Sequence, residues 1–310
     1  MPGSTSVLRK ALLIKREVTP GVSSTPDATN GVASILTFTP KLSPMRVDKK
    51  NVAKRTFGPD MPEFDPDGSD ISLQIDTPAF KAATPGAKPT VAELLFACGL
   101  KETVTANTKV TYEPQTTDNP KTAQSSSAEL FFAGHQYSLV GVRGTFTLTG
   151  APKDGLVFKF TLSAPWSEAD TNIAIPAAPP DPGNRVTFSS VTAVTSNGDE
   201  IDIGAFEFSL NAEIQVSVSS VGVNVYLLDH KPTLKIDPFA TATLSDWNRL
   251  LASSSFALHA SFNGGALVLD IPKAVLVESN PKDRSGRISN ERVFECCEVD
   301  GDDQFLLTFA

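Results

Sequence analysis

Short runs in which apolar and polar residues alternate recur along most of this 310-residue chain. Such alternation places apolar side chains on one face of a β-strand and polar side chains on the other. Proline and glycine separate the runs and favour turns between them. The runs are Ile35–Pro40, Ile71–Thr77, Lys109–Glu113, Thr145–Thr149, Leu156–Ser163, Phe206–Leu210, Glu213–Ser219, Thr233–Asp237, Ser255–Phe262, Leu267–Ile271 and Gln304–Phe309. We therefore predict a mostly β fold.

Two segments show helical spacing instead. In Thr90–Cys98 the apolar residues fall on one side, Thr90 is the expected N-cap, and Gly99 is the residue expected just after the helix. Ser245–Leu251 begins with a second capping residue and carries apolar residues at helical spacing. We predict one short helix at each place.

The two predicted helices follow similar strands and precede further strands, which suggests a duplication. Three residues recur 161 positions later: Leu73, Ile75 and Asp76 return as Leu234, Ile236 and Asp237. Because the shared pattern is short, chance similarity is the alternative. The prediction is two tandem β-sandwich or barrel domains, each with one short flanking helix, at 1–172 and 185–310.

A proline-rich segment, Ile173–Gly183, separates the predicted domains. Proline at this density excludes a helix or a central strand and favours an extended linker, which we place at 173–184. A proline-rich recognition motif is the functional alternative. Thr19–Asn30 and Thr116–Ser127 are rich in turn formers and are predicted to be long loops.

The charge is −8 and lies mostly in the second part of the chain. Residues 1–175 carry 18 Lys and Arg against 17 Asp and Glu, whereas residues 176–310 carry 9 against 18. Neither part has the basic footprint that binding to a nucleic-acid duplex needs. The three cysteines and a first segment without signal-peptide character lead us to expect a protein made in a reducing cytoplasm.

Motifs for catalysis or metal binding are missing from the sequence. The acidic stretch Pro59–Asp70 lacks the glycine position and the following helix of a calcium-binding loop, so a solvated turn is the better interpretation. A second acidic turn contains Asp300, Asp302 and Asp303, and the three histidines stand far apart. We expect no enzyme activity, no cofactor and no metal site.

The order of several segments resembles the major tail tube proteins of bacteriophages with long, flexible, non-contractile tails. The segments that carry the resemblance are Val7–Gly21, Ile35–Gly58, Val91–Pro114, Gly141–Trp166, Asp229–Ala240 and Gly301–Ala310. The resemblance implies tail-tube-like domains that join side by side into a continuous β-barrel around a channel. Many such proteins give one domain each to a six-membered ring, so two domains in one chain imply a trimeric, pseudo-hexameric ring.

The partners implied by the resemblance are other copies of the chain, a tape-measure protein, and the tail terminator and distal tail proteins. Double-stranded DNA would pass through the stacked rings during ejection without specific binding, and the location would be the virion tail, without membrane insertion. A carbohydrate-binding adhesin or receptor-binding module is the alternative, although tryptophan and tyrosine, which stack on sugars, are few.

The resemblance also suggests which residues contact the next ring and which line the channel. Lys41–Asp70 is basic and then acidic, and opposite charges on successive stretches can pair between rings. The inter-ring candidates are Met45, Arg46, Asp48, Lys49, Lys50, Lys54, Arg55, Asp65 and Asp67. The lumen candidates, on the polar faces of two strands, are Gln74, Asp76 and Asp237, and we expect an acidic channel wall that weakly repels phosphates. An outer surface is the alternative place for these polar faces.

Overall fold

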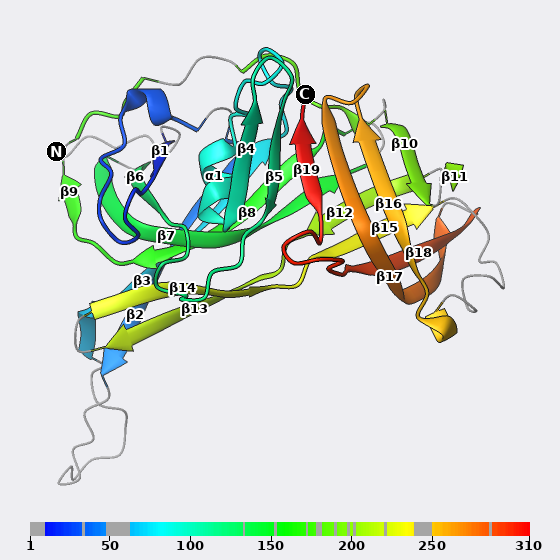
Figure 1. Ribbon diagram of the computed structural model, residues 1–310. Helices are drawn as coiled ribbons and strands as arrows, with labels where there is room; N and C mark the ends of the chain where they lie inside the picture. Colours follow the sequence, from blue (N-terminus) through cyan, green and yellow to red (C-terminus); the bar gives the residue numbers. More distant parts are fainter. Residues whose placement is uncertain are drawn as a thin grey trace, which may run out of the picture.

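The computed structural model describes residues 10–32, 35–47, 63–132, 134–151, 154–171, 173–177, 182–188, 191–196, 199–200, 203–219, 222–238, 250–284 and 287–310 (Figure 1). Within these residues the fold is mostly β, as predicted, and every strand pairing is antiparallel. The described helical structure consists of α1 (Ala92–Ala97), the short 3-10 helix η1 (Ala28–Asn30), residues 250–252 and a 3-10 residue at Phe188.

The strands of the first half end at Thr171. They are β1 (Lys10–Arg16), β2 (Thr37–Val47), β3 (Glu63–Pro78), β4 (Leu100–Thr105), β5 (Lys109–Pro114), β6 (Ser126–Phe132), β7 (His135–Gly150), β8 (Val157–Pro165) and β9 (Ala169–Thr171). The strands of the second half are β10 (Val191–Ser196), β11 (Asp199–Glu200), β12 (Ile203–Ser209), β13 (Ala212–Ser219), β14 (Gly222–His230), β15 (Thr233–Pro238), β16 (Ser255–Phe262), β17 (Leu267–Arg284), β18 (Arg287–Cys296) and β19 (Leu306–Phe309). Each predicted run overlaps one of these strands.

The strands pair in the same order in the two halves. In the first half the order is β1–β6–β7–β8–β3–β2. In the second half it is β10–β16–β17–β18–β15–β12. The long strands β7 and β17 play the same part, because each pairs with one neighbour near its start and with another near its end. The similar sequences around Ile75 and Ile236 lie on corresponding strands, β3 and β15.

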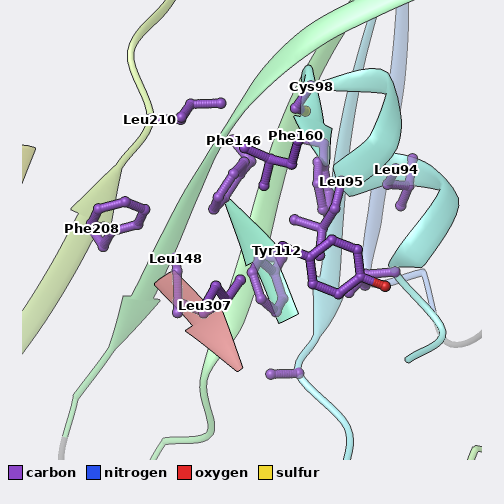
Figure 2. Close-up of a cluster of buried hydrophobic side chains, with 14 of the residues drawn as sticks. Leu94, Leu95, Cys98, Tyr112, Phe146, Leu148, Phe160, Phe208, Leu210 and Leu307 are labelled. Atoms are coloured by element: carbon purple, nitrogen blue, oxygen red, sulfur yellow. The ribbon is translucent and has the colours of Figure 1, made fainter. Parts of the chain in front are cut away.

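The two halves share one sheet and one hydrophobic core. β7 pairs with β12 across the halves, and β5 pairs with β19, so that 17 strands are connected. Phe208 and Leu210 of the second half point toward Phe146 and Leu148 of the first (Figure 2), and all four are buried. The Phe146 and Phe208 rings lie 6.0 Å apart. The division into two domains stays a prediction.

The residues just after the predicted linker join the first half directly. Val186 donates its backbone N–H to Ala79 and accepts one from Leu156, with N···O distances of 2.8 and 3.0 Å. Val186 and Phe188 are both buried in the shared core. The residues described on either side of 178–181 form no helix or extended strand, as the proline content predicts.

Helix α1 covers the core with its apolar side, where Leu94, Leu95 and Cys98 are fully buried. Gly99 has a φ of +80°, which confirms its predicted place just after the helix, where glycine adopts the left-handed conformation without strain. The predicted N-cap is wrong, because Val91 holds the cap position without a side-chain hydrogen bond. The second predicted helix is described only at its end, since residues 245–249 lie outside the described residues.

A cluster of charges fastens α1 to the neighbouring strands. Arg16 of β1 binds Glu93 of α1 at 2.9 Å and Glu102 of β4 at 3.2 Å. Lys88 and the Tyr112 hydroxyl also bind Glu102, at 2.7 and 2.9 Å. Burial raises the pKa of Glu102, but the hydrogen bonds from Lys88, Arg16 and Tyr112 outweigh it, so the pKa lies below its ordinary value.

Candidate assembly surfaces

One face of the joined sheet is polar, and we call it the polar face. Along β3, β8, β12 and β15 every second residue is buried, so the residues between them share the opposite side. The polar face carries Ser72, Gln74, Asp76, Lys159, Thr161, Thr147, Glu207, Ser209, Thr233, Lys235 and Asp237. The three lumen candidates, Gln74, Asp76 and Asp237, therefore lie together on one surface that runs across both halves.

Asp76 and Asp237 also line one shallow hollow of about 640 Å³. Lys159, Glu207, Lys235 and Glu291 line the same hollow. The hollow spans strands of both halves, so the repeated aspartates, 161 positions apart in sequence, are neighbours in the fold.

Charges of both signs alternate on the polar face. Asp76 stands opposite Lys159 on β8, and Glu207 stands opposite Lys235 on β15. Lys235 binds Glu291 at 3.2 Å, and Lys282 binds the same carboxylate. Burial raises the pKa of Glu291, but the hydrogen bonds from Lys282 and Lys235 outweigh it and hold the pKa below its ordinary value. The described acidic residues of this face thus have lysines beside them.

The inter-ring candidates belong to the far end of the β2–β3 hairpin. Met45 pairs with Asp65 there, and Arg46 pairs with Phe64. Phe64 is 56% exposed and Met45 is 39% exposed, which is unusual for large apolar side chains. Asp67 lies in β3, but its side chain is not described. The other candidates, Asp48, Lys49, Lys50, Lys54 and Arg55, lie outside the described residues.

A second hairpin, β13–β14, occupies the corresponding place in the second half. It connects β12 to β15, just as the end of the β2–β3 hairpin connects β2 to β3. Figure 1 shows it running back toward the first half, where β14 contacts β3, β7 and β8. The sequence pattern predicted the strand Glu213–Ser219 but not this hairpin. The turn-forming residues before Gly222 and the alternation that follows were the signal available.

Buried groups hold the β13–β14 hairpin against the first half. Arg143, only 5% exposed, donates to the Val225 carbonyl of β14 and also to the Ala123 carbonyl at 2.7 Å. Leu227 is buried beside Gly99, where an added Cβ would come within 2.3 Å of its side chain. His230 lies 3.4 Å from the Cys98 carbonyl, and burial lowers its pKa. The hairpin is thus a fixed part of the fold.

The acidic residues near the C-terminal strand act as turn caps. Asp303 accepts the backbone N–H groups of Val299 and Asp300, at 2.8 and 3.1 Å. Asp302 accepts the Thr116 N–H at 2.7 Å. Among the described residues no three His, Cys, Asp or Glu side chains gather as metal ligands, and no helix there is long and apolar enough to cross a membrane.

A wide polar sheet face and a hairpin end that exposes large apolar side chains are typical of a structural protein that associates with copies of itself. A family model described as phage tail tube protein matches residues 8–288, which is most of the chain. The chain therefore belongs to the phage tail tube family, and its role is structural, in the virion tail. No curated protein matches it.

Proposed function

We propose that this chain forms closed rings that stack into the tail tube, the conduit for DNA ejection. The family supports assembly into a tube. The observation that supports a closed ring is the strand order repeated in the two halves. If each half is one unit of the wall, the β7–β12 pairing is a junction between units within one chain. Three chains then give a ring of six units by closed cyclic symmetry.

The polar face is the proposed lining of the channel. Duplex DNA carries about one charge per 1.7 Å, so a lining rich in free Lys and Arg would hold it. Lysines of this face have carboxylates close by, as Lys235 has Glu291 at 3.2 Å. Such a balanced lining offers little net attraction to phosphates. The described polar face carries Asp76, Glu207 and Asp237 against Lys159 and Lys235, so the acidic wall that we propose is only slightly acidic.

The proposed inter-ring contact is the end of the β2–β3 hairpin. Its exposed Phe64 and Met45 offer apolar surface, and Arg46 and Asp65 offer charge. A variant in which a short turn replaces residues 46–64 should fold and form single rings that do not stack. Normal-length tubes from this variant would contradict the contact.

Negative-stain microscopy and native mass spectrometry of the purified chain test the proposal. Rings or tubes with three chains per ring support it. Discrete monomers at every concentration would favour the adhesin or receptor-binding alternative. Six chains per ring would contradict the pairing of two units in one chain. The tape-measure protein and the tail terminator and distal tail proteins are the further proposed partners, which co-purification from assembled tails would identify.

A further inference from the structure

The second half has a strand edge that corresponds to an occupied edge in the first half. The end of β7 pairs with β8 on one side and with β12 on the other. The end of β17 pairs with β18, and no described strand pairs with its other side beyond Val275. On the opposite rim of the sheet, β2 pairs with β3 alone among the described strands. The two outer edges of the sheet are therefore β2 and the end of β17.

The repeat fixes how the residues of these edges correspond. Ile75 stands opposite Phe38, and the corresponding Ile236 stands opposite Phe206. Phe38 therefore corresponds to Phe206, and four residues later Leu42 corresponds to Leu210. That both positions repeat their residue type supports the correspondence.

The same reasoning gives the residues of β17 that correspond to residues of β7. Leu73 is joined through Leu162 to Gly144, and Leu234 is joined through Phe294 to Leu276. Gly144 thus corresponds to Leu276. Beyond the bulge between Leu276 and Glu278, the two junction residues Thr147 and Thr149 correspond to Asn280 and Lys282.

We propose that the β2 edge of one copy pairs antiparallel with the end of β17 of a second copy, in the register of the β7–β12 junction. In that junction Thr147 stands opposite Ser209, and Thr149 stands opposite Glu207. Between copies, Asn280 then stands opposite Lys41 of the second copy, and Lys282 stands opposite its Thr39. The inference rests on the proposed ring, and it specifies which edges close that ring.

Exposed apolar surface supports a partner at the β2 edge. Leu210 is fully buried, because the β7–β12 junction covers it. The corresponding Leu42 is 45% exposed, and Leu36, just before the strand, is 54% exposed. A second copy in the same position would cover Leu42 and contribute about 25 cal/mol per Å² of apolar surface removed from water.

Charge also favours this pair of edges. β2 carries Lys41 and Arg46 and no acidic residue. In the proposed register Lys41 lies diagonally across from Glu278, an exposed carboxylate of β17, and on the other diagonal from Lys282, whose charge is paired with Glu291. Diagonal pairs of opposite charge on neighbouring strands attract, and like-charged edges would repel a wrong partner.

Each edge carries a proline, and the register brings the two prolines face to face. Leu210 donates its N–H to Phe146, so Phe208 and Leu148, two residues along, form the next hydrogen-bonded pair. Between copies, Pro40 takes the position of Phe208 and Pro281 takes the position of Leu148. Neither donates a ladder hydrogen bond, and the loss falls on this single pair. The interface is thus a weaker version of the internal junction, as suits a chain that folds before it assembles.

Engineered disulfides test the register. Lys41 and Asn280 would form a non-hydrogen-bonded pair, whose Cα atoms, about 4.5 Å apart, fit a disulfide. In a Cys297→Ser background, Lys41→Cys with Asn280→Cys should bond between chains and give a covalent closed ring after oxidation. Thr147→Cys with Ser209→Cys is the matched control, since those hydroxyls lie 3.0 Å apart and should bond within one chain.

Microscopy of the same samples distinguishes a failure of the edge pairing from a failure of the proposed function. If rings or tubes form but the Lys41–Asn280 pair does not bond, the edge pairing is wrong while the proposed function stands. If Thr39→Cys with Asn280→Cys bonds instead, the register is overturned. If no rings or tubes form under any condition, the proposed function itself fails. Closure at a number of chains other than three keeps the edge pairing and contradicts the trimer.

Discussion

Strands β12 and β2 have corresponding places in the two halves, but they have different surroundings. β12 lies between β7 and β15, whereas β2 has β3 on one side and no described strand on the other. As a result Leu210 is fully buried and Leu42 is 45% exposed. The chain thus contains one complete junction, β7–β12, and two edges, β2 and the end of β17, that we propose form the same junction between copies. The β7–β12 junction indicates the register in which those two edges would pair.

The two hairpins extend the comparison. The β13–β14 hairpin lies against the first half of its own chain, held by Arg143 and Leu227. The end of the β2–β3 hairpin instead exposes Phe64 and Met45. The exposed end of the β2–β3 hairpin thus corresponds to a hairpin that is covered within the same chain.

The largest expected effect comes from one substitution made at both corresponding leucines. Leu210→Ala should lower the free energy of unfolding by about 3 kcal/mol, because it leaves a cavity in a packed core. Leu42→Ala should change it by less than about 1 kcal/mol, because Leu42 is half exposed. Chemical denaturation of the unassembled chain measures both values. Equal losses at the two positions would break the comparison.

At Leu42 a substitution should affect assembly strongly and folding only slightly. Leu42→Asp should leave the unfolding midpoint close to that of the natural chain and prevent ring formation, because a carboxylate would be buried at the interface. The exposed Val104→Asp is the control and should still form rings. Rings formed normally by Leu42→Asp would show that β2 is not an interface.

The sequence predicted the strands with clear alternation and missed the others. Alternation marks a strand such as Leu156–Ser163 because one face of the sheet is buried. Strands β1, β4, β6, β9, β10, β11, β14 and β18 were not predicted. Which strands become neighbours depends on contacts far apart in sequence, so the β7–β12 junction could not be predicted. The polar face was predictable in part, as Asp76 and Asp237, because the repeat brought them to attention.

Another prediction concerns the β13–β14 hairpin. Arg143→Met should lower the free energy of unfolding by about 2–3 kcal/mol, since buried carbonyls such as that of Val225 lose their donor. Hydrogen exchange should become faster in β14 before it does so in β8. Arg185→Met, at an exposed position, is the control and should change stability by less than about 1 kcal/mol. Unchanged exchange in β14 would show that the hairpin does not depend on Arg143.

A further prediction concerns the charge cluster that fastens α1 in the first half. Because the pKa of Glu102 is lowered in the folded chain, its stabilisation is present above the unfolded pKa of about 4.3 and is lost as the pH falls through the folded pKa. Glu102→Gln should lower the free energy of unfolding by about 1–2 kcal/mol at pH 7, with a smaller difference below about pH 4. Thermal unfolding across this pH range measures the difference.

A matched control sharpens this result. Glu113 binds Lys101 at 2.6 Å, but that pair is far more exposed than Glu102. Glu113→Gln should therefore change stability by less than about 1 kcal/mol at every pH, since exposed ion pairs contribute little. If the two variants had equal effects, burial of Glu102 would not be the cause.

The smallest expected effect on folding belongs to the repeated aspartates, Asp76 and Asp237, which test whether the two halves line the channel alike. Both lie on the polar face and line the same hollow. Asp76→Lys with Asp237→Lys should leave tubes assembled and slow DNA ejection, most at low salt, because new cations attract phosphates and salt screens that attraction.

Asp76→Lys alone should slow ejection about as much as Asp237→Lys alone if the two halves are equivalent. Leu251, which is 85% exposed and is not a residue of the polar face, gives the control variant Leu251→Lys, which should not affect ejection. Ejection rates that stay the same at every ionic strength for the double variant would place the polar face outside the channel. A slow rate for only one of the single variants would keep the face in the channel and show that its two halves are not equivalent.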